Sequence, residues 1–130
     1  MASFGTLKAD TLTHSTAGSL ATNFVVEGSA KAWCKWNASV TVDDSLNQSS
    51  MVDVGTGDYE VVFTTSFGAA SKFAAAGIGG QYGSTNGYIS WTGGGNNSTH
   101  ADRIKVQLVN ASGSAVDADK NAIIVHGDLA

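Results

Sequence analysis

The stretch MVDVGTGDYEVVFTTSF, from Met51 to Phe67, decides the fold class. Its second half places every other side chain on one face of an extended chain: Tyr59, Val61, Phe63, Thr65 and Phe67. A period of two is typical of a strand with one buried face. Gly55-Thr56-Gly57 supplies residues that tolerate a positive φ, as a tight hairpin requires. The stretch therefore predicts a strand, a short turn and a longer strand.

Further segments rich in β-branched and aromatic residues predict more strands. They are KAWCKWNASVTV (31–42), KFAAAGIG (72–79), TNGYISW (85–91), RIKVQLVN (103–110) and NAIIVHG (121–127). The first is one strand, or two strands broken at Asn37. DDSLNQSS (43–50), TGGGNNSTH (92–100) and NASGS (110–114) have the chemistry of turns and loops. Short strands joined by such turns predict an all-β fold, a small antiparallel β-sandwich.

The best helix candidate is FGAASKFAAAG (67–77), because alanine favours helix. Its flanking glycines and its place between strands favour strand instead, so we expect no helix. The predicted core contains Trp33, Trp36, Tyr59, Phe63, Phe67 and the inward side of 103–110, namely Ile104, Val106 and Leu108.

Residues 1–28 differ from the rest of the chain. Their apolar side chains are sparse and fit neither helical nor strand spacing: Phe4, Leu7, Leu12 and Leu20. We therefore predict an extended N-terminal arm for assembly or attachment, called the arm below, and a β-sandwich domain at 29–130, called the body. An arm of this kind must pack on its own body, on a sister subunit or on a larger assembly, or else stay mobile.

Composition excludes several classes of protein. The net charge is −4 and no cluster of Lys or Arg occurs, which argues against nucleic-acid binding. No run approaches the ~20 apolar residues of a membrane-spanning helix. The N-terminus lacks the basic start and apolar run of a secretion signal. We expect synthesis in the cytoplasm, with no nucleic-acid partner and no membrane insertion.

The sequence gives little support for a catalytic site or a metal-binding site. Cys34 is the only cysteine, and a small buried apolar role is favoured over a reactive thiol. His14, His100 and His126 lack the spacing of a zinc site. The carboxylates fall at predicted turns and strand ends rather than as the facing pair of a glycosidase. We expect no catalytic residue, cofactor or metal.

One cluster has the residue types of a sugar-binding surface. Aromatic side chains flank a loop rich in glycine and asparagine, and the candidate residues are Tyr82, Tyr88, Trp91, Asn96, Asn97 and His100. Rings that stack on a sugar beside short polar groups commonly hold glycans. The alternative, which we favour, is that the aromatic rings pack a sheet edge or a subunit contact.

The segment AKAWCKWNASVTVDDSLNQSSMVDVGTGDYEVVFTTSF (30–67) resembles a module of tail-fibre and other virion proteins of bacteriophages, notably phages of aquatic bacteria. The matching motifs are Lys31-Ala32-Trp33, Ser45-Leu46-Asn47-Gln48-Ser49-Ser50, Val54-Gly55-Thr56-Gly57-Asp58-Tyr59 and Phe63-Thr64. TLKADTLTHSTAG (6–18) and VHGDLA (125–130) are similar to segments that open and close the module. Cys34-Lys35 and Val54 depart from the usual residues.

The resemblance implies a virion surface protein that assembles as a homo-oligomer, commonly a trimer. We expect a tail-fibre-like module that attaches to the particle by its arm, and a host surface glycan is its candidate host contact. The alternative placement is the capsid, as a decoration protein bound to the major capsid protein. A glycan-degrading enzyme is the least favoured interpretation. Small residues would allow chains to approach closely: Ala69, Ala70, Ala74, Ala75 and Ala76.

Overall fold

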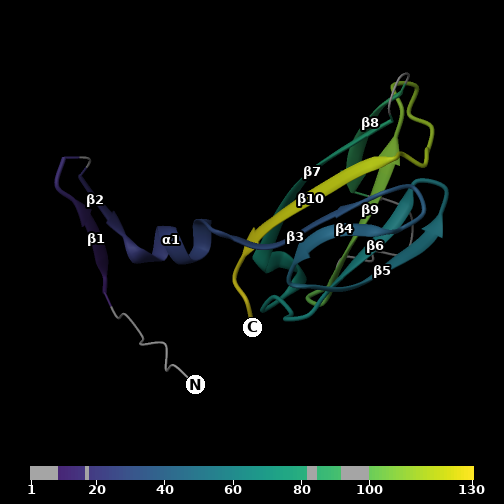
Figure 1. Cartoon of the computed structure of the whole chain (residues 1–130). Helices are drawn as coiled ribbons and strands as arrows, with labels where there is room; N and C mark the ends of the chain where they lie inside the picture. The colour runs from purple at the N-terminus through teal and green to yellow at the C-terminus, as the bar shows by residue number, and fades with distance from the viewer. Residues whose placement is uncertain (1–8, 17, 82–84, 92–99) are drawn as a thin grey trace.

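The computed structural model describes residues 9–130 except 17, 82–84 and 92–99. Within this part the chain has two regions, and Figure 1 shows the arm projecting from one end of a β-rich body. The body strands are β3 (Ala30–Trp36), β4 (Val42–Leu46), β5 (Gln48–Gly55), β6 (Asp58–Phe63), β7 (Phe73–Gln81), β8 (Thr85–Trp91), β9 (Arg103–Val109) and β10 (Lys120–Gly127).

The eight body strands form one hydrogen-bonded sheet in the order β4-β3-β10-β7-β8-β9-β6-β5. Every pairing in this sheet is antiparallel. The all-β class and the antiparallel arrangement are confirmed. Each segment predicted as a further strand contains one. In KAWCKWNASVTV the strand β3 ends at Trp36, just before Asn37, and only the first residue of β4, Val42, lies in the segment.

The sheet curves until its distant strands pack their side chains together. Trp36 of β3 meets Tyr59 of β6 edge to face, with ring centroids 5.8 Å apart, although four strands separate β3 from β6 in the sheet. Alternate residues of β3, β6, β9 and β10 fill the space between them. Ile104, Val106 and Leu108 face inward as predicted. The core therefore lies inside the curved sheet, entirely within the body.

The edge strands β4 and β5 are neighbours in sequence, joined only by Asn47. Asn47 has a φ of 54°, and its side chain is fixed by Thr65. Its Oδ1 accepts a hydrogen bond from the Thr65 N–H at 2.7 Å, and its Nδ2 donates to the Thr65 carbonyl at 3.0 Å. The prediction that residues 43–50 form a loop was therefore wrong. The side chain of one asparagine makes a sharp corner between two strands.

The predicted hairpin around Gly55-Thr56-Gly57 is confirmed, and it packs against the rest of the body. Gly57 has a φ of 71°, and its carbonyl accepts a hydrogen bond from the Leu108 N–H at 2.8 Å. The Asp117 carboxylate accepts hydrogen bonds from the Gly57 N–H at 2.7 Å and from the Tyr59 hydroxyl at 3.0 Å. Asp117 thus ties the hairpin to the loop between β9 and β10.

The alternation predicted along β6 ends earlier than expected. The strand stops at Phe63, and Thr65 is exposed because the chain bends to bond with Asn47. Phe67 is nevertheless buried, where its ring packs with those of Phe63 and Phe73 at centroid distances of 5.0 and 4.7 Å. The helix candidate at 67–77 holds only a short 3₁₀ turn, Ala70–Lys72, before β7 begins.

The arm is more structured than the predicted extended chain. It contains a hairpin of β1 (Thr11–His14) and β2 (Gly18–Ala21), followed directly by the helix α1 (Thr22–Gly28). The Thr22 N–H donates to the Asp10 carbonyl at 2.9 Å, which links the helix to the base of the hairpin. The expectation of no helix was therefore wrong. Phe4 and Leu7 lie outside the described residues.

Candidate functional site

Half of the predicted glycan-contact cluster falls beyond the described part of the structure. Tyr82, Asn96 and Asn97 lie outside the described residues. The backbones of Tyr88 and Trp91 lie on β8, which pairs with β9. His100 is exposed, and its backbone pairs with that of Arg103 immediately before β9. The structure therefore places three of the six candidates along or beside adjacent strands.

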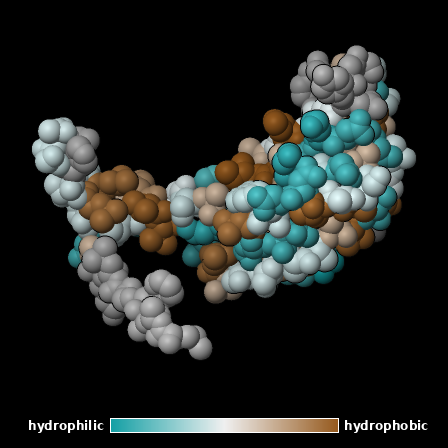
Figure 2. Space-filling view, in the orientation of Figure 1, coloured by the Kyte–Doolittle hydropathy of each residue, from teal (hydrophilic) through white to brown (hydrophobic). Residues whose placement is uncertain are grey.

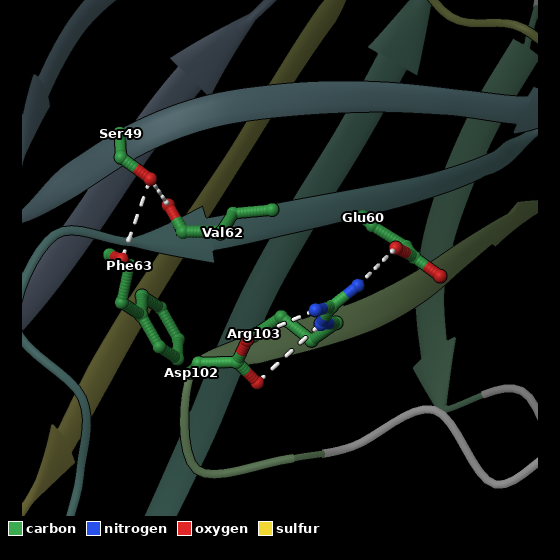
Figure 3. A network of polar contacts seen from close by, with 6 residues as sticks. All are labelled: Ser49, Glu60, Val62, Phe63, Asp102 and Arg103. Carbon is green, nitrogen blue, oxygen red and sulfur yellow. Dashed lines mark hydrogen bonds and ion pairs between the residues drawn. The ribbon is translucent and has the colours of Figure 1, made fainter.

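A polar network lies next to His100, on the face of β6 and β9 that points away from the core (Figure 3). The Arg103 guanidinium pairs with the Asp102 carboxylate at 2.9 Å and reaches Glu60 on β6 at 3.5 Å. The hydrogen bond and charge of Arg103 lower the pKa of Asp102, and Asp102 in turn raises the pKa of Arg103. Asp102 is thus held as a carboxylate, whereas a general acid needs a raised pKa.

Cys34 is buried in the core, as its sequence context predicted. Burial raises the pKa of its thiol from 9.0 to about 11. Since the thiolate is the nucleophile, the thiol is chemically quiet at neutral pH. Cys34 therefore acts as a small apolar side chain in the packing of β3.

The described residues also bear on metal binding. Among those residues, no group of three or more His, Cys, Asp or Glu side chains is placed to hold a metal ion. His126 makes a structural contact instead, because its Nδ1 donates to the Gly28 carbonyl at 2.9 Å. Across the same residues, no helix has the length and apolar character needed to cross a membrane.

A groove of about 460 Å³ runs across the outer face of β3, β10 and β7. Its lining includes Trp33, Lys35, Ala76, Ile78, Ala122 and Ile124. Placing Trp33 in the core was wrong, since it is only half-buried and faces this groove. The signal was present in the sequence: Ala32, Cys34 and Trp36 point inward, so the residues between them must point outward. The groove is the main candidate binding surface of the described chain.

The second candidate surface is the arm itself. Phe24 and Val26 on α1 are 65% and 61% exposed, and Val25 between them is also exposed. Leu12 and Leu20, predicted as assembly residues, lie opposite each other in the arm hairpin and are exposed as well. Figure 2 shows a concentrated hydrophobic surface over α1, next to the narrow junction with the body. Apolar side chains gathered in this way mark contact surfaces.

Comparison of the chain with protein-family models, curated proteins and solved structures finds no match.

Proposed function

We propose that this chain is a structural protein of a bacteriophage particle, a tail-fibre-like surface module that attaches to the particle by its arm. It acts as a homo-oligomer, a trimer by the resemblance of residues 30–67, and carries out no catalysis. The body is a β-sandwich, and its candidate contacts with a glycan on the host surface are Tyr82, Tyr88, Trp91, Asn96, Asn97 and His100. Its partners are other copies of itself and other virion proteins.

The observation that carries this proposal is the exposed apolar surface of the arm. In water, an isolated helix shorter than about 12 residues is marginal, and so is an isolated two-stranded hairpin. The arm consists of a seven-residue helix and one such hairpin, with no buried residue in the helix. An element of this kind gains stability when a neighbouring surface covers its apolar side chains. Attachment to a multi-subunit particle supplies such a surface.

The body supports the same proposal by its construction. Its sheet is held at several points by side chains that bond to residues distant in sequence, among them Asn47, Asp117 and Arg103. Cys34 is buried and Asp102 is held ionised, so these groups serve packing and charge pairing. A rigid scaffold with a separate attachment element suits a particle component that bears load or presents a surface.

The proposal is tested by quantitative mass spectrometry of purified phage particles. A tail appendage predicts about a dozen copies per particle, whereas a capsid decoration protein predicts on the order of hundreds, because copy number follows the symmetry of the attachment site. Finding no copies on particles would overturn the proposal. New reducing ends after incubation with host surface polysaccharide would overturn the absence of catalysis.

Attachment through the arm is tested with matched variants. Leu12→Lys and Leu20→Lys place charges on the arm hairpin, and Val52→Lys places one at an exposed apolar position of the body. We expect the arm variants to lower the number of copies bound per particle and Val52→Lys to leave it unchanged. Equal binding by all three would exclude the arm hairpin as the attachment element.

A further inference from the structure

Two exposed apolar surfaces stand out among the described residues, and none of those residues covers either surface. One is helix α1 of the arm, and the other is the groove across β3, β10 and β7. We propose that the groove of one copy holds helix α1 of a second copy, so that arm exchange builds the homo-oligomer.

The side chains that line the groove leave a hollow that fits a short helix. Strand register places Leu46, Trp33, Ile124 and Ala76 side by side across four strands, with Lys35, Ala122 and Ile78 in the next outward row. Directly paired residues of antiparallel strands lie on the same face. The small side chains of Ala76 and Ala122 therefore form a floor between larger neighbours. Ile78 at the margin is 73% exposed, the highest value among the large apolar side chains described.

The helix matches the groove in size and chemistry. Seven helical residues span about 10 Å. The distance from β3 across β10 to β7 is also about 10 Å, because neighbouring strands lie about 4.8 Å apart. Phe24 offers an apolar side chain to fill the hollow, and Glu27, three residues further on the same helix face, offers a carboxylate to Lys35, which pairs with Asp43 of its own chain at 3.0 Å. Docking would also stabilise a helix that is too short to stand alone in water.

The chain's own helix is held away from its own groove. Only Ser29 separates α1 from β3, and the end of α1 is anchored to the body. His126 donates a hydrogen bond to the Gly28 carbonyl at 2.9 Å, and the Lys31 ammonium donates to the Val26 carbonyl. These bonds direct α1 outward from the sheet end, as Figure 1 shows.

This anchoring also explains why a second copy is the suitable occupant. His126 lies two residues along β10 from Ile124, so each arm leaves the body at the end of its own groove. When every copy gives one helix and receives one, the exchange builds a symmetric oligomer, which is closed where the rotation between copies completes a ring. The β1–β2 hairpin beyond the helix then remains available for attachment to other proteins.

The first test is the mass of the full-length protein in solution, measured by sedimentation equilibrium over a concentration series. We expect an oligomer whose dissociation constant rises at least tenfold in Phe24→Lys and in Ile78→Lys. Val52→Lys, which changes an exposed apolar position on the edge strand β5, is the matched control and should leave the dissociation constant unchanged. A protein that stays monomeric throughout the concentration series would overturn the proposal. An oligomer whose dissociation constant is unchanged by Phe24→Lys or by Ile78→Lys would overturn it as well.

The second test identifies the occupant of the groove directly. Single-cysteine additions on the helix, Phe24→Cys and Val26→Cys, are each mixed with an isotope-labelled groove variant, Ile78→Cys or Ile124→Cys, and oxidised. A disulfide between labelled and unlabelled chains in at least one pairing is expected, because only docking between copies brings these positions together. Val52→Cys in place of the groove variant is the control. Yields no higher than with this control would show that another ligand, or nothing, fills the groove.

The inference rests on the homo-oligomer of the proposed function but not on its placement in a virion. Cross-linking between copies by a protein missing from particles would refute the placement alone. A protein abundant on particles that never cross-links would refute the arm exchange alone.

Discussion

The arm and the body contain similar residue types but place them in opposite environments. Both include antiparallel strands, and both contain aromatic and β-branched residues, which in the arm include Phe24, Val25 and Val26 of the helix. In the body, Trp36, Tyr59 and Leu108 are fully buried. In the arm, Phe24, Val25 and Val26 face solvent along a single helix. The body thus buries an apolar core of its own and leaves only part of its apolar surface exposed, such as the groove, whereas the arm leaves its apolar side chains exposed for another surface.

The comparison teaches that secondary structure and tertiary stability are separate properties of this chain. Burial of apolar area, at roughly 25 cal/mol per Å², is the dominant favourable contribution to folding. All of the buried hydrophobic cluster lies between Ala32 and Val125 of the body. A substitution in the body should therefore change the free energy of unfolding far more than a similar one in the arm.

The largest expected effect comes from Trp36→Ala. Trp36 packs edge to face on Tyr59 in the centre of the core, so its loss leaves a cavity. We expect the free energy of unfolding to fall by about 3–5 kcal/mol, as measured by urea denaturation monitored by circular dichroism. That loss is a large share of the roughly 5–15 kcal/mol of an ordinary domain.

Its matched partner in the arm is Phe24→Ala, measured at a protein concentration low enough to separate copies. Since the Phe24 side chain is mostly exposed, the free energy of unfolding should change by no more than about 0.5 kcal/mol. A loss above about 1 kcal/mol in this dilute sample would mean that the arm packs on its own body. It would contradict the conclusion that the arm adds little to the stability of the body.

Gly57 in the body and Gly28 in the arm differ in the space around their Cα atoms. A methyl group on Gly57 would lie 2.6 Å from the Leu108 carbonyl oxygen and 2.8 Å from the Val116 nitrogen, both backbone atoms that cannot move aside alone. The positive φ of Gly57 adds backbone strain. Gly57→Ala should therefore destabilise the body by roughly 2–3 kcal/mol, as measured by thermal unfolding.

Gly28, at the end of α1, is the control for this prediction. It has no atoms near the position of an added methyl group, and its φ is not positive. Gly28→Ala should leave the unfolding of the body within about 0.5 kcal/mol of the parent protein while favouring the helix. A similar loss in both variants would show that the effect comes from removing any glycine rather than from the packed turn.

The strands of the body could be predicted from the sequence because period-two patterns and glycine turns are local signals. Tyr59, Val61 and Phe63 alternate with polar residues, and burial follows that alternation. Asn47 escaped prediction, since its role depends on Thr65, which is distant in sequence. The segment around it has the composition of a loop, and long-range pairing overrides that composition.

The candidate surfaces were less predictable than the strands. Helix α1 contains Phe24, Val25 and Val26, and these residue types favour strands over helices. No periodic spacing of its apolar residues marks a helical face. The groove depends on which strands become neighbours, and β3, β10 and β7 are far apart in the sequence. Periodicity alone could place Trp33 on an outer face, but only the strand order brings it beside Ile124.

The smallest expected effect concerns a single hydrogen bond in each region. Tyr59→Phe removes the bond from the Tyr59 hydroxyl to Asp117, at 3.0 Å, and should lower the free energy of unfolding at pH 7 by about 1 kcal/mol. Thr22→Val removes the bond from the Thr22 hydroxyl to the Ala9 carbonyl, at 2.6 Å, on the exposed arm. Water can replace that bond, so urea unfolding of the body should not change.

The hydrogen bond of Tyr59 in the body is tested further by the pH dependence of the free energy of unfolding in the parent protein and in Tyr59→Phe. Burial, and then the hydrogen bond to Asp117, raise the pKa of Tyr59 above its ordinary value. Since the unfolded chain loses this proton first, the contribution of Tyr59 is complete below about pH 10 and is lost as the pH rises toward its higher folded-state pKa. Tyr59→Phe lacks this titration, whereas Cys34 is present in both proteins and its effect cancels. The stability difference between the parent protein and Tyr59→Phe should therefore narrow above about pH 10 in urea denaturation series, and a constant difference would contradict the assignment.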